Sequence, residues 1–403
     1  MTVLVTGGAG FIGCAFVRRL LRTDPDARAV VLDALTYAGN LDNLAEALGD
    51  APVVTPAAHA VAGLVEFALD AGAAVPLPQA PAVERERWAR KLAGRPARVV
   101  PREDATAAAL DLAAGPGRLA VVVGHVTDPG LTRSLVAACD AVVHFAAETH
   151  VDRSIVDADA FLRTDVHGTY VMLEAARAAK RLSRFVHVST DEVYGPADGA
   201  SFTESDAVNP CNPYSAAKTA ADRLAFAYHR THRVPVSIVR PSNNFGPFQY
   251  PEKLIPVTIL KALADEPIPV YGDGRQVRDW LYVDDTAHAI DLVLRGGADG
   301  EAYNVAGRSE RENLDTVGRI LARLGKPASL VRHVTDRPGH DRRYSLDDSR
   351  IREDMGFTPG GRFEDRLDAT VDWYVANRAW WERTLREDRE YREFMELWYA
   401  GRR

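Results

Sequence analysis

The sequence has few cysteines and no long apolar segment. Its three cysteines, Cys14, Cys139 and Cys211, lie far apart and form no CxxC pair. A disulfide framework or a zinc site of the usual ligand spacing is therefore not expected, and we predict no bound metal. No apolar run of about 18 residues occurs, so no membrane span is predicted. Because Met1 leads directly into a strand-like run, there is no room for a signal peptide, and we expect a cytoplasmic protein.

The chain also lacks an excess of positive charge. Its formal net charge of −7 argues against nucleic acid as a partner attracted by bulk charge. Hydrophobic residues make up 46% of the chain and charged residues 26%, which is the balance of a folded globular protein. A length of 403 residues suffices for a large domain and a smaller one.

A glycine-rich turn stands near the start, between a predicted strand and a predicted amphipathic helix. Gly7, Gly10 and Gly13 recur at every third position. In dinucleotide-binding folds such glycines permit a tight turn and let backbone amides approach a pyrophosphate. The next predicted strand ends at Asp33, whose carboxylate would bind the adenosine ribose and repel a 2′-phosphate. The pattern predicts a site for NAD rather than NADP.

Apolar runs of strand length alternate with helical patterns in the first part of the chain. The predicted strands are 2–6, 29–32, 119–124, 140–145 and 184–189, and a long helix is predicted over 161–180. Repeated strand–helix units are typical of βαβ folds, so we expect a parallel, doubly wound α/β sheet.

The segment from about residue 50 to 117 differs in composition, because it is rich in Ala, Pro and Val. Strand-like pieces at 53–54 and 97–100 and helix-like pieces at 57–71, 82–92 and 105–114 predict a small αβ insertion. It carries a basic cluster, which consists of Arg85, Arg87, Arg90, Lys91, Arg95 and Arg98. The simpler interpretation of this cluster is the solvated face of a helix, and the alternative is a lid or a partner surface.

Reactive side chains follow the predicted strand 184–189. Thr190, Asp191 and Glu192 come directly after it, at the end where open α/β sheets bind ligands. Tyr214 and Lys218 are four residues apart, so a helix would place both side chains on one face. An ammonium group beside a phenol lowers the pKa of the phenol, and such a tyrosine can take a proton from a sugar hydroxyl. A simple dehydrogenase has no need of the additional carboxyl groups, so their presence points to chemistry beyond oxidation.

Taken in order, these and later motifs resemble the extended short-chain dehydrogenase/reductase superfamily and, within it, the dTDP-glucose 4,6-dehydratases. The matching stretches are 6–13, 33, 36–40, 146–155, 189–195, 214–218, 243–247, 251–256, 271–274, 278–280 and 336–344. The resemblance covers nearly everything except about residues 50–117. It implies a Rossmann-type doubly wound parallel sheet with a smaller mixed α/β C-terminal substrate domain and an αβ insertion.

The resemblance also implies a division of labour along the chain. Residues 1–242 would form the NAD-binding domain with the catalytic residues, and residues 243–403 would mainly bind the nucleotide sugar. Helices at about 161–180 and 214–231 would form a homodimer interface. The aromatic tail, 373–399, would pack as helices on its own domain.

Roles for further residues follow from the same resemblance. NAD would be held by Gly7, Gly10, Phe11, Ile12, Gly13, Asp33, Thr36, Gly39, Ala146, Ala147, Thr149, Thr164, Tyr214, Lys218 and Asn243. The nucleotide sugar would be held by Glu148, His150, Asn243, Glu252, Lys253, Leu254, Tyr271, Arg278, Asn313, Arg337 and His340. Two residues depart from the family pattern: Cys14 replaces a serine, and His125 replaces an aspartate that reaches the adenine.

The implied reaction is the conversion of dTDP-glucose to dTDP-4-keto-6-deoxyglucose and water. Tyr214, aided by Lys218 and Thr190, would take the proton of the sugar 4-hydroxyl during oxidation by NAD. Glu192 would remove the C5 proton, and Asp191 would protonate the departing C6 hydroxyl.

Three alternatives stay open at this point. The first is a UDP- or CDP-hexose 4,6-dehydratase, and the second is a 4-epimerase. The Asp191–Glu192 pair speaks against the epimerase, because epimerases of the superfamily generally carry small hydroxyl or apolar residues there. The third is a non-catalytic NAD-binding regulator, which would have no need of all five reactive residues.

Overall fold

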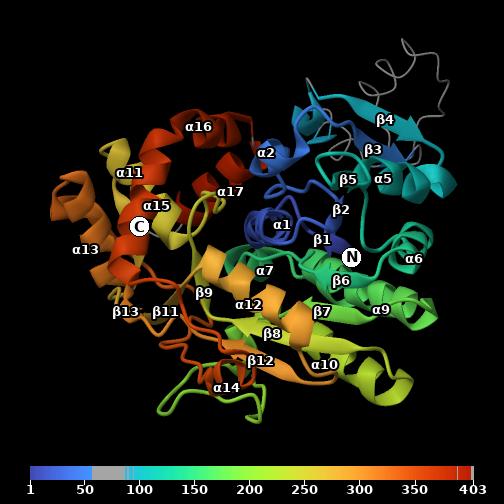
Figure 1. Ribbon diagram of the computed structural model, residues 1–403. Coiled ribbons are helices and arrows are strands. Elements are labelled where there is room, and N and C mark those ends of the chain that lie inside the picture. Colours follow the sequence, from blue (N-terminus) through green and yellow to red (C-terminus); the bar gives the residue numbers. More distant parts are fainter. Residues whose placement is uncertain (57–86, 89, 94, 388, 401–403) are drawn as a thin grey trace.

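A parallel sheet forms the centre of the computed structural model, which describes residues 1–56, 87–88, 90–93, 95–387 and 389–400 (Figure 1). Its nine strands lie in the order β12-β8-β7-β6-β1-β2-β5-β3-β4. They are β1 (Thr2–Thr6), β2 (Arg28–Asp33), β3 (Val53–Pro56), β4 (Ala97–Val100), β5 (Leu119–Val123), β6 (Ala141–His144), β7 (Arg184–Val188), β8 (Val236–Pro241) and β12 (Ala302–Val305). The predicted Rossmann-type α/β fold is confirmed.

Both faces of this sheet are buried. In β1, Val3 and Val5 point into one hydrophobic core and Leu4 into the other. The first core lies under α1 (Phe11–Thr23) and α12 (Val283–Gly296), which pack on each other. The second lies under α5 (Ala105–Ala113), α6 (Pro129–Ala138), α9 (Gly168–Ala178) and α10 (Pro213–His232). Strands buried on both faces are apolar throughout, which is why the sequence revealed them.

The insertion extends the main sheet instead of forming a unit of its own. β3 pairs in parallel with β5 and with β4, so the two strands predicted in the insertion lie at the edge of the nine-stranded sheet. The helix predicted at 105–114 is α5. The helix predicted at 57–71 lies outside the described residues, and of the one predicted at 82–92 the described residues 87, 88 and 90–92 are helical.

The helix predicted over 161–180 is interrupted. It consists of α8 (Asp159–Phe161), a π-helical segment η4 (Leu162–His167) and α9. Asp165 in η4 is buried, and its Oδ1 accepts a hydrogen bond from the Glu148 backbone N–H at 2.7 Å. π-Turns are frequent at functional sites. Periodicity in the sequence predicts helix here but gives no sign of the break.

The C-terminal part contains two smaller sheets and a layer of helices. The sheets are β13-β11-β9, of Glu310–Glu312, Val277–Tyr282 and Asn243–Phe245, and β10-β14, of Ile268–Tyr271 and Val331–Val334. The helices are α11 (Leu254–Leu263), α13 (Asn313–Leu324), α14 (Ser349–Met355), α15 (Phe363–Ala376), α16 (Arg378–Glu387) and α17 (Arg389–Ala400). Because β12 and α12 return to the main sheet, the division at residue 242 stays a prediction.

The aromatic tail packs on its own domain, as predicted, and also contacts the N-terminal half. Trp380, Trp381 and Tyr391 are buried, and the Trp380 indole N–H donates to Asn43 Oδ1 at 3.1 Å. Asn43 lies in η1 (Leu41–Leu44), which is followed by α2 (Ala45–Leu48). The tail thus ties the C-terminal helices to the N-terminal half. Among the described residues, each helix is too short or too polar to cross a bilayer.

Candidate active site

A single cavity of about 820 Å³ collects the predicted site residues. It lies where the carboxyl ends of the central strands face the C-terminal part. Every residue predicted above to be catalytic, to hold NAD or to hold the nucleotide sugar lines this cavity. The structure therefore brings together side chains from Gly7 to His340, while the individual roles stay predictions.

The glycine turn at one end of the cavity fits a dinucleotide. Gly7 has a φ of +69°, and a Cβ there would stand 2.8 Å from the Ala146 backbone nitrogen. A Cβ on Gly13 would stand 2.3 Å from the Gly7 carbonyl oxygen. Only glycine allows this close packing at the start of α1, where backbone N–H groups and the helix dipole favour phosphate. The turn can therefore hold a pyrophosphate, as the sequence predicts.

Asp33 is fixed by the backbone of its surroundings. Its Oδ1 accepts from the Leu35 N–H at 2.8 Å, and its Oδ2 accepts from the Ala9 N–H at 2.9 Å. Burial raises the pKa of this carboxyl, and the two N–H bonds act in the opposite direction. The loop that follows lines the cavity, so the carboxylate faces the end suited to an adenosine ribose.

The two departures from the family pattern have different surroundings. Cys14 is buried, and burial raises the pKa of its thiol to about 11, so it is an inert packing residue. His125 lines the cavity, and its ring lies 5.8 Å from that of Trp88, a residue of the insertion.

Thr190 organises the carboxyl groups at the end of β7. It is the N-cap of the short helix η5 (Asp191–Tyr194), and its Oγ1 accepts from the Glu192 N–H at 3.3 Å. The same hydroxyl donates to Asp191 Oδ1 at 3.0 Å. Burial, reinforced by the neighbouring charge of Glu192, raises the pKa of Asp191 to about 8. Asp191 is therefore protonated at neutral pH and can act as an acid.

Tyr214 and Lys218 lie one turn apart on α10, as predicted. An Asn212 capping box and Pro213 begin this helix. The side chains of Tyr214 and Lys218 are both buried. The Lys218 ammonium donates to the Val188 carbonyl oxygen at 2.8 Å. The helix start thus sets the tyrosine beside the end of β7.

The expected lowering of the Tyr214 pKa is wrong for this structure. Burial, followed by the charges of Glu192 and Asp165, raises the pKa of the phenol well above its usual value. Burial also lowers the pKa of Lys218, whose charge is favoured by the nearby carboxyls of Asp165 and Asp222. Burial is the largest of the effects on the phenol, so Tyr214 is neutral here.

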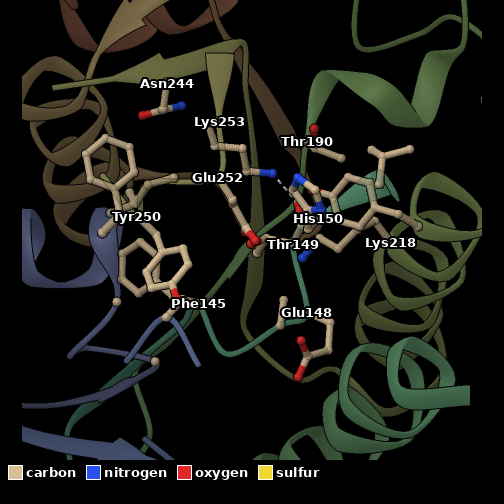
Figure 2. Close-up of a pocket in the computed structure, with 18 of the residues that line it drawn as sticks. Phe145, Glu148, Thr149, His150, Thr190, Lys218, Asn244, Tyr250, Glu252 and Lys253 are labelled. Atoms are coloured by element: carbon tan, nitrogen blue, oxygen red, sulfur yellow. Dashed lines mark hydrogen bonds between the residues drawn. The ribbon is translucent and has the colours of Figure 1, made fainter. Parts of the chain in front are cut away.

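The middle of the cavity is strongly polar (Figure 2). Glu252 accepts from Tyr37 Oη at 3.0 Å and pairs with Arg153 Nε at 3.3 Å. Lys253 donates to the Thr149 carbonyl oxygen at 2.7 Å. In Figure 2, Glu252, Lys253, Thr149 and His150 lie between Tyr250 on one side and Lys218 on the other. Burial lowers the pKa of His150 to about 4, so this imidazole is neutral at neutral pH.

Cationic side chains line the end of the cavity away from the glycine turn. Arg337 pairs with Asp152 Oδ1 at 3.0 Å, and the Arg278 guanidinium lies 4.3 Å from the centre of the Tyr344 ring. Burial, followed by the charges of Arg337 and Arg278, lowers the pKa of His340 to about 4. Arginine suits a diphosphate through its forked donors.

Several buried polar atoms at the cavity wall have no hydrogen-bond partner among the described residues. They are Asn243 Oδ1, Asn313 Oδ1, Arg337 Nε and His150 Nδ1. Buried polar groups are normally paired, so these atoms suit a polar ligand.

The sequence reasoning missed residues that act through other side chains. Tyr37 and Arg153 hold Glu252, while Asp152 holds Arg337. Tyr344 Oη lies 2.8 Å from Asp341 Oδ2 and 3.3 Å from Glu192 Oε2. Asp152, Arg153 and Tyr344 stand inside motifs that the resemblance rests on, which was the only signal for them.

Comparisons with known proteins agree with this geometry. Residues 101–370 match a family described as GDP-mannose 4,6 dehydratase, and residues 3–75 match the NAD dependent epimerase/dehydratase family. A curated dTDP-glucose 4,6-dehydratase of Streptomyces niveus is 44% identical over 386 residues, which covers 95% of each chain.

Two solved structures are similar over nearly their whole length. DesIV, a dTDP-glucose 4,6-dehydratase from Streptomyces venezuelae solved with NAD and TYD bound, gives a TM-score of 0.76 at 41% identity and covers 95% of this chain and 100% of its own. The NAD complex of dTDP-glucose 4,6-dehydratase from Bacillus anthracis gives a TM-score of 0.73 at 34% sequence identity. The match covers 95% of this chain and 99% of that structure's chain. The chain belongs to the dTDP-glucose 4,6-dehydratase family of NAD-dependent nucleotide-sugar enzymes.

Proposed function

We propose that the protein converts dTDP-glucose to dTDP-4-keto-6-deoxyglucose and water with the help of bound NAD. The observation that carries this proposal is the placement of Asp191 and Glu192 in one cavity with Tyr214, Lys218 and the glycine turn. A 4-epimerase or a simple dehydrogenase needs the tyrosine and the lysine but has no task for a buried, protonated carboxyl group. A non-catalytic NAD-binding regulator needs none of these side chains.

The glycine turn, Asp33 and the loop after it would hold NAD. When bound, NAD supplies the acceptor for a hydride from C4 of the sugar and the donor of a hydride to C6. Thr190 orients the sugar 4-hydroxyl, and Tyr214 accepts its proton once the phenol has ionised to the phenolate. Lys218, held by the Val188 carbonyl, places a positive charge near the phenol and opposes the effect of the surrounding carboxylates.

Elimination falls to the two carboxyl groups of η5. The C4 ketone acidifies the proton at C5, and Glu192 removes it as general base. Asp191, whose pKa is raised to about 8, gives its proton to the C6 hydroxyl so that water leaves. Glu192 then returns its proton to C5. Tyr344 steadies Glu192 across 3.3 Å, while Thr190 holds Asp191.

The nucleotide end supports a diphosphate-linked sugar. Arg337 and Arg278 would bind the diphosphate, and Asn243 and Asn313 offer unpaired oxygens for its hydroxyl groups or base. The relatives named above favour thymine as the base. The family description matched by residues 101–370 favours GDP-mannose as a second candidate.

The test is incubation of the purified protein with dTDP-glucose without added NAD. We expect a product with the alkaline absorbance of a 4-keto-6-deoxy sugar and a mass lower by one water. Parallel reactions with UDP-glucose, CDP-glucose and GDP-mannose determine the base. No product from any of them, even with added NAD, would contradict the dehydratase proposal and leave the NAD-binding regulator.

We also propose that the protein is a cytoplasmic homodimer. The segment predicted to form the interface carries exposed apolar side chains, because Leu162 is 54% and Tyr170 is 43% exposed. Light scattering of the wild type and of a Leu162→Arg, Tyr170→Asp variant tests this. A dimeric mass that the double substitution leaves unchanged would place the interface elsewhere.

A further inference from the structure

Lys91 of the insertion is bonded to one short loop of the main domain. Its ammonium group donates to the carbonyl oxygens of Thr36, Tyr37 and Gly39, the second of these at 2.9 Å. An ammonium group has three donors, so this loop can accept all three of its protons. The interpretation of the basic cluster as a solvated helix face is therefore wrong for Lys91.

Neighbouring residues of the insertion reinforce this contact. Trp88 is 1% exposed, and its indole N–H donates to the Ala34 carbonyl oxygen at 2.6 Å. Arg95 pairs with Asp42 Oδ1 at 2.7 Å, just beyond the far end of the loop. The segment between β2 and η1 is thus held from outside at its beginning, in its middle and at its end.

The held loop forms one wall of the cofactor end of the cavity. Asp33, Ala34, Thr36, Tyr37, Ala38 and Gly39 all line the cavity. Leu35 is buried with a φ of +48°, a left-handed conformation that a leucine rarely adopts without outside support. Its N–H donates to Asp33 Oδ1, so the shape of the loop also sets the position of the carboxylate that faces the ribose.

The residues that hold the loop lie where neither matched family extends. One match ends at residue 75 and the other begins at residue 101, so Trp88, Lys91 and Arg95 fall between them. The two family matches therefore do not include the residues of this contact.

We propose that Trp88 and Lys91 form a clamp that fixes the loop 34–40 in the shape that binds the adenosine half of NAD. These are positioning residues that act through backbone carbonyls of the loop. Fixing the loop before NAD arrives removes an ordering cost, so the clamp strengthens binding. A cofactor that must stay bound through oxidation, elimination and reduction gains from such a device. The proposal rests on the proposed function only for the identity of the cofactor.

The test compares Lys91→Met, Trp88→Phe and Lys91→Arg with Arg90→Met, a control that changes an exposed arginine next to Lys91. Two quantities are measured without turnover: the NAD released from each purified protein by acid, and the calorimetric Kd for NAD after bound nucleotide is stripped. Loss of the Lys91 ammonium is expected to raise this Kd about tenfold or more, the change for one charge-assisted hydrogen bond. Lys91→Arg should recover part of it, and Arg90→Met should match the wild type.

Binding of dTDP provides the control for folding, because Arg278 and Arg337, the predicted diphosphate ligands, lie outside the loop and make none of the contacts of the clamp. In the variants the Kd for dTDP should stay within about twofold of the wild type, a change too small to be a lost hydrogen bond. Trp88→Phe keeps a smaller aromatic ring and removes the indole N–H donor, so it tests the clamp even if Lys91→Met fails to fold. An unchanged Kd for NAD in folded Lys91→Met and Trp88→Phe overturns the proposal, and a product from dTDP-glucose would not rescue it.

Discussion

Thr190 forms a hydrogen bond with one carboxyl oxygen of Asp191 and leaves the other carboxyl oxygen without a partner among the described residues. Thr190 Oγ1 donates to Asp191 Oδ1 at 3.0 Å, while Oδ2 is buried without a hydrogen-bond partner within the described part of the chain. Asp191 lines the cavity, so Oδ2 is the oxygen available to carry the proton. The pKa of about 8 has burial as its first cause and the charge of Glu192 as its second.

The rate of water elimination is therefore expected to fall at alkaline pH. Below a pKa of about 8 Asp191 carries the proton that the C6 hydroxyl needs, and above it the proton is lost. The kcat for dTDP-glucose, measured across pH, should decline on the alkaline side with this pKa. Asp191→Asn should lower kcat by about 10²–10⁴-fold, the usual contribution of a general acid. Asp284→Asn changes an exposed aspartate on α12 and should behave as the wild type. An Asp191→Asn enzyme of normal kcat would remove Asp191 from the mechanism.

Glu192→Gln should separate oxidation from elimination. Without its carboxylate the proton at C5 has no base, so exchange of that proton with solvent should slow by about 100-fold or more. The measurement is deuterium incorporation at C5 of product formed in D₂O. Tyr344→Phe removes the contacts of the phenol to Glu192 at 3.3 Å and to Asp341 at 2.8 Å but keeps the Glu192 carboxylate, so it should have a far smaller effect. Equal exchange in Glu192→Gln and the wild type would assign the base to another group.

The parts of the site that the sequence predicted are those whose pattern lies within one element or a few consecutive elements. Gly7, Gly13 and Asp33 follow from strand–turn–helix–strand spacing, and Tyr214 with Lys218 from the turn of one helix. Asp165 could not be predicted, because a π-helical segment that shows no change in apolar periodicity brings it to Lys218.

Lys91 and the Tyr214 pKa escaped prediction for a related reason. The contacts of Lys91 join residues that are more than fifty positions apart, and the shift at Tyr214 is a sum over burial and carboxylates from different elements. Neither the contacts of Lys91 nor the pKa shift of Tyr214 can be inferred from a local sequence pattern. The fold was easier to predict, because each strand that is buried on both faces is a continuous apolar run in the sequence.

Gly13→Ala should remove NAD from the purified protein. The new Cβ would stand 2.3 Å from the Gly7 carbonyl oxygen, so the turn must shift away from the pyrophosphate. Overpacking of this kind costs about 1–3 kcal/mol of unfolding free energy. Gly318→Ala is the matched control, because a Cβ on this exposed glycine of α13 would meet nothing within 4 Å, and the variant should gain about 0.4–1 kcal/mol. Full NAD content in Gly13→Ala would contradict the close-packing argument.

The buried ion pair of Arg240 and Asp222 should contribute more to the free energy of unfolding than an exposed ion pair does. Arg240 donates to both oxygens of Asp222 at 2.8 and 2.9 Å, and both side chains are almost fully buried. Burial alone would raise the pKa of Asp222, but the hydrogen bonds and charge of Arg240 lower it. The stabilisation is thus present at neutral pH and is lost only as pH falls through the lowered pKa.

Asp222→Asn should therefore cost about 3–5 kcal/mol in urea unfolding at neutral pH, because it leaves a buried guanidinium uncompensated. Arg323→Ala, which breaks an exposed pair with Asp372, should show no resolvable change. Similar losses of unfolding free energy in both variants would mean that burial does not determine how much each ion pair contributes to stability.

The C-terminal helix is expected to tune substrate affinity from behind the cavity wall. Tyr271 lines the cavity and donates to Asp152 Oδ2 at 2.7 Å, and the Trp398 indole N–H donates to Tyr271 Oη at 2.6 Å. Asp152 in turn holds Arg337, so loss of the indole donor loosens a chain that ends at the predicted diphosphate site. Trp398→Phe should raise the KM for dTDP-glucose several-fold, about the effect of one neutral hydrogen bond, and change kcat less. Leu397→Ala alters an adjacent side chain that is 79% exposed and should leave KM as it is. If both variants shift KM alike, the helix acts by bulk packing; if Trp398→Phe alone does, the indole donor orders the wall that receives the substrate.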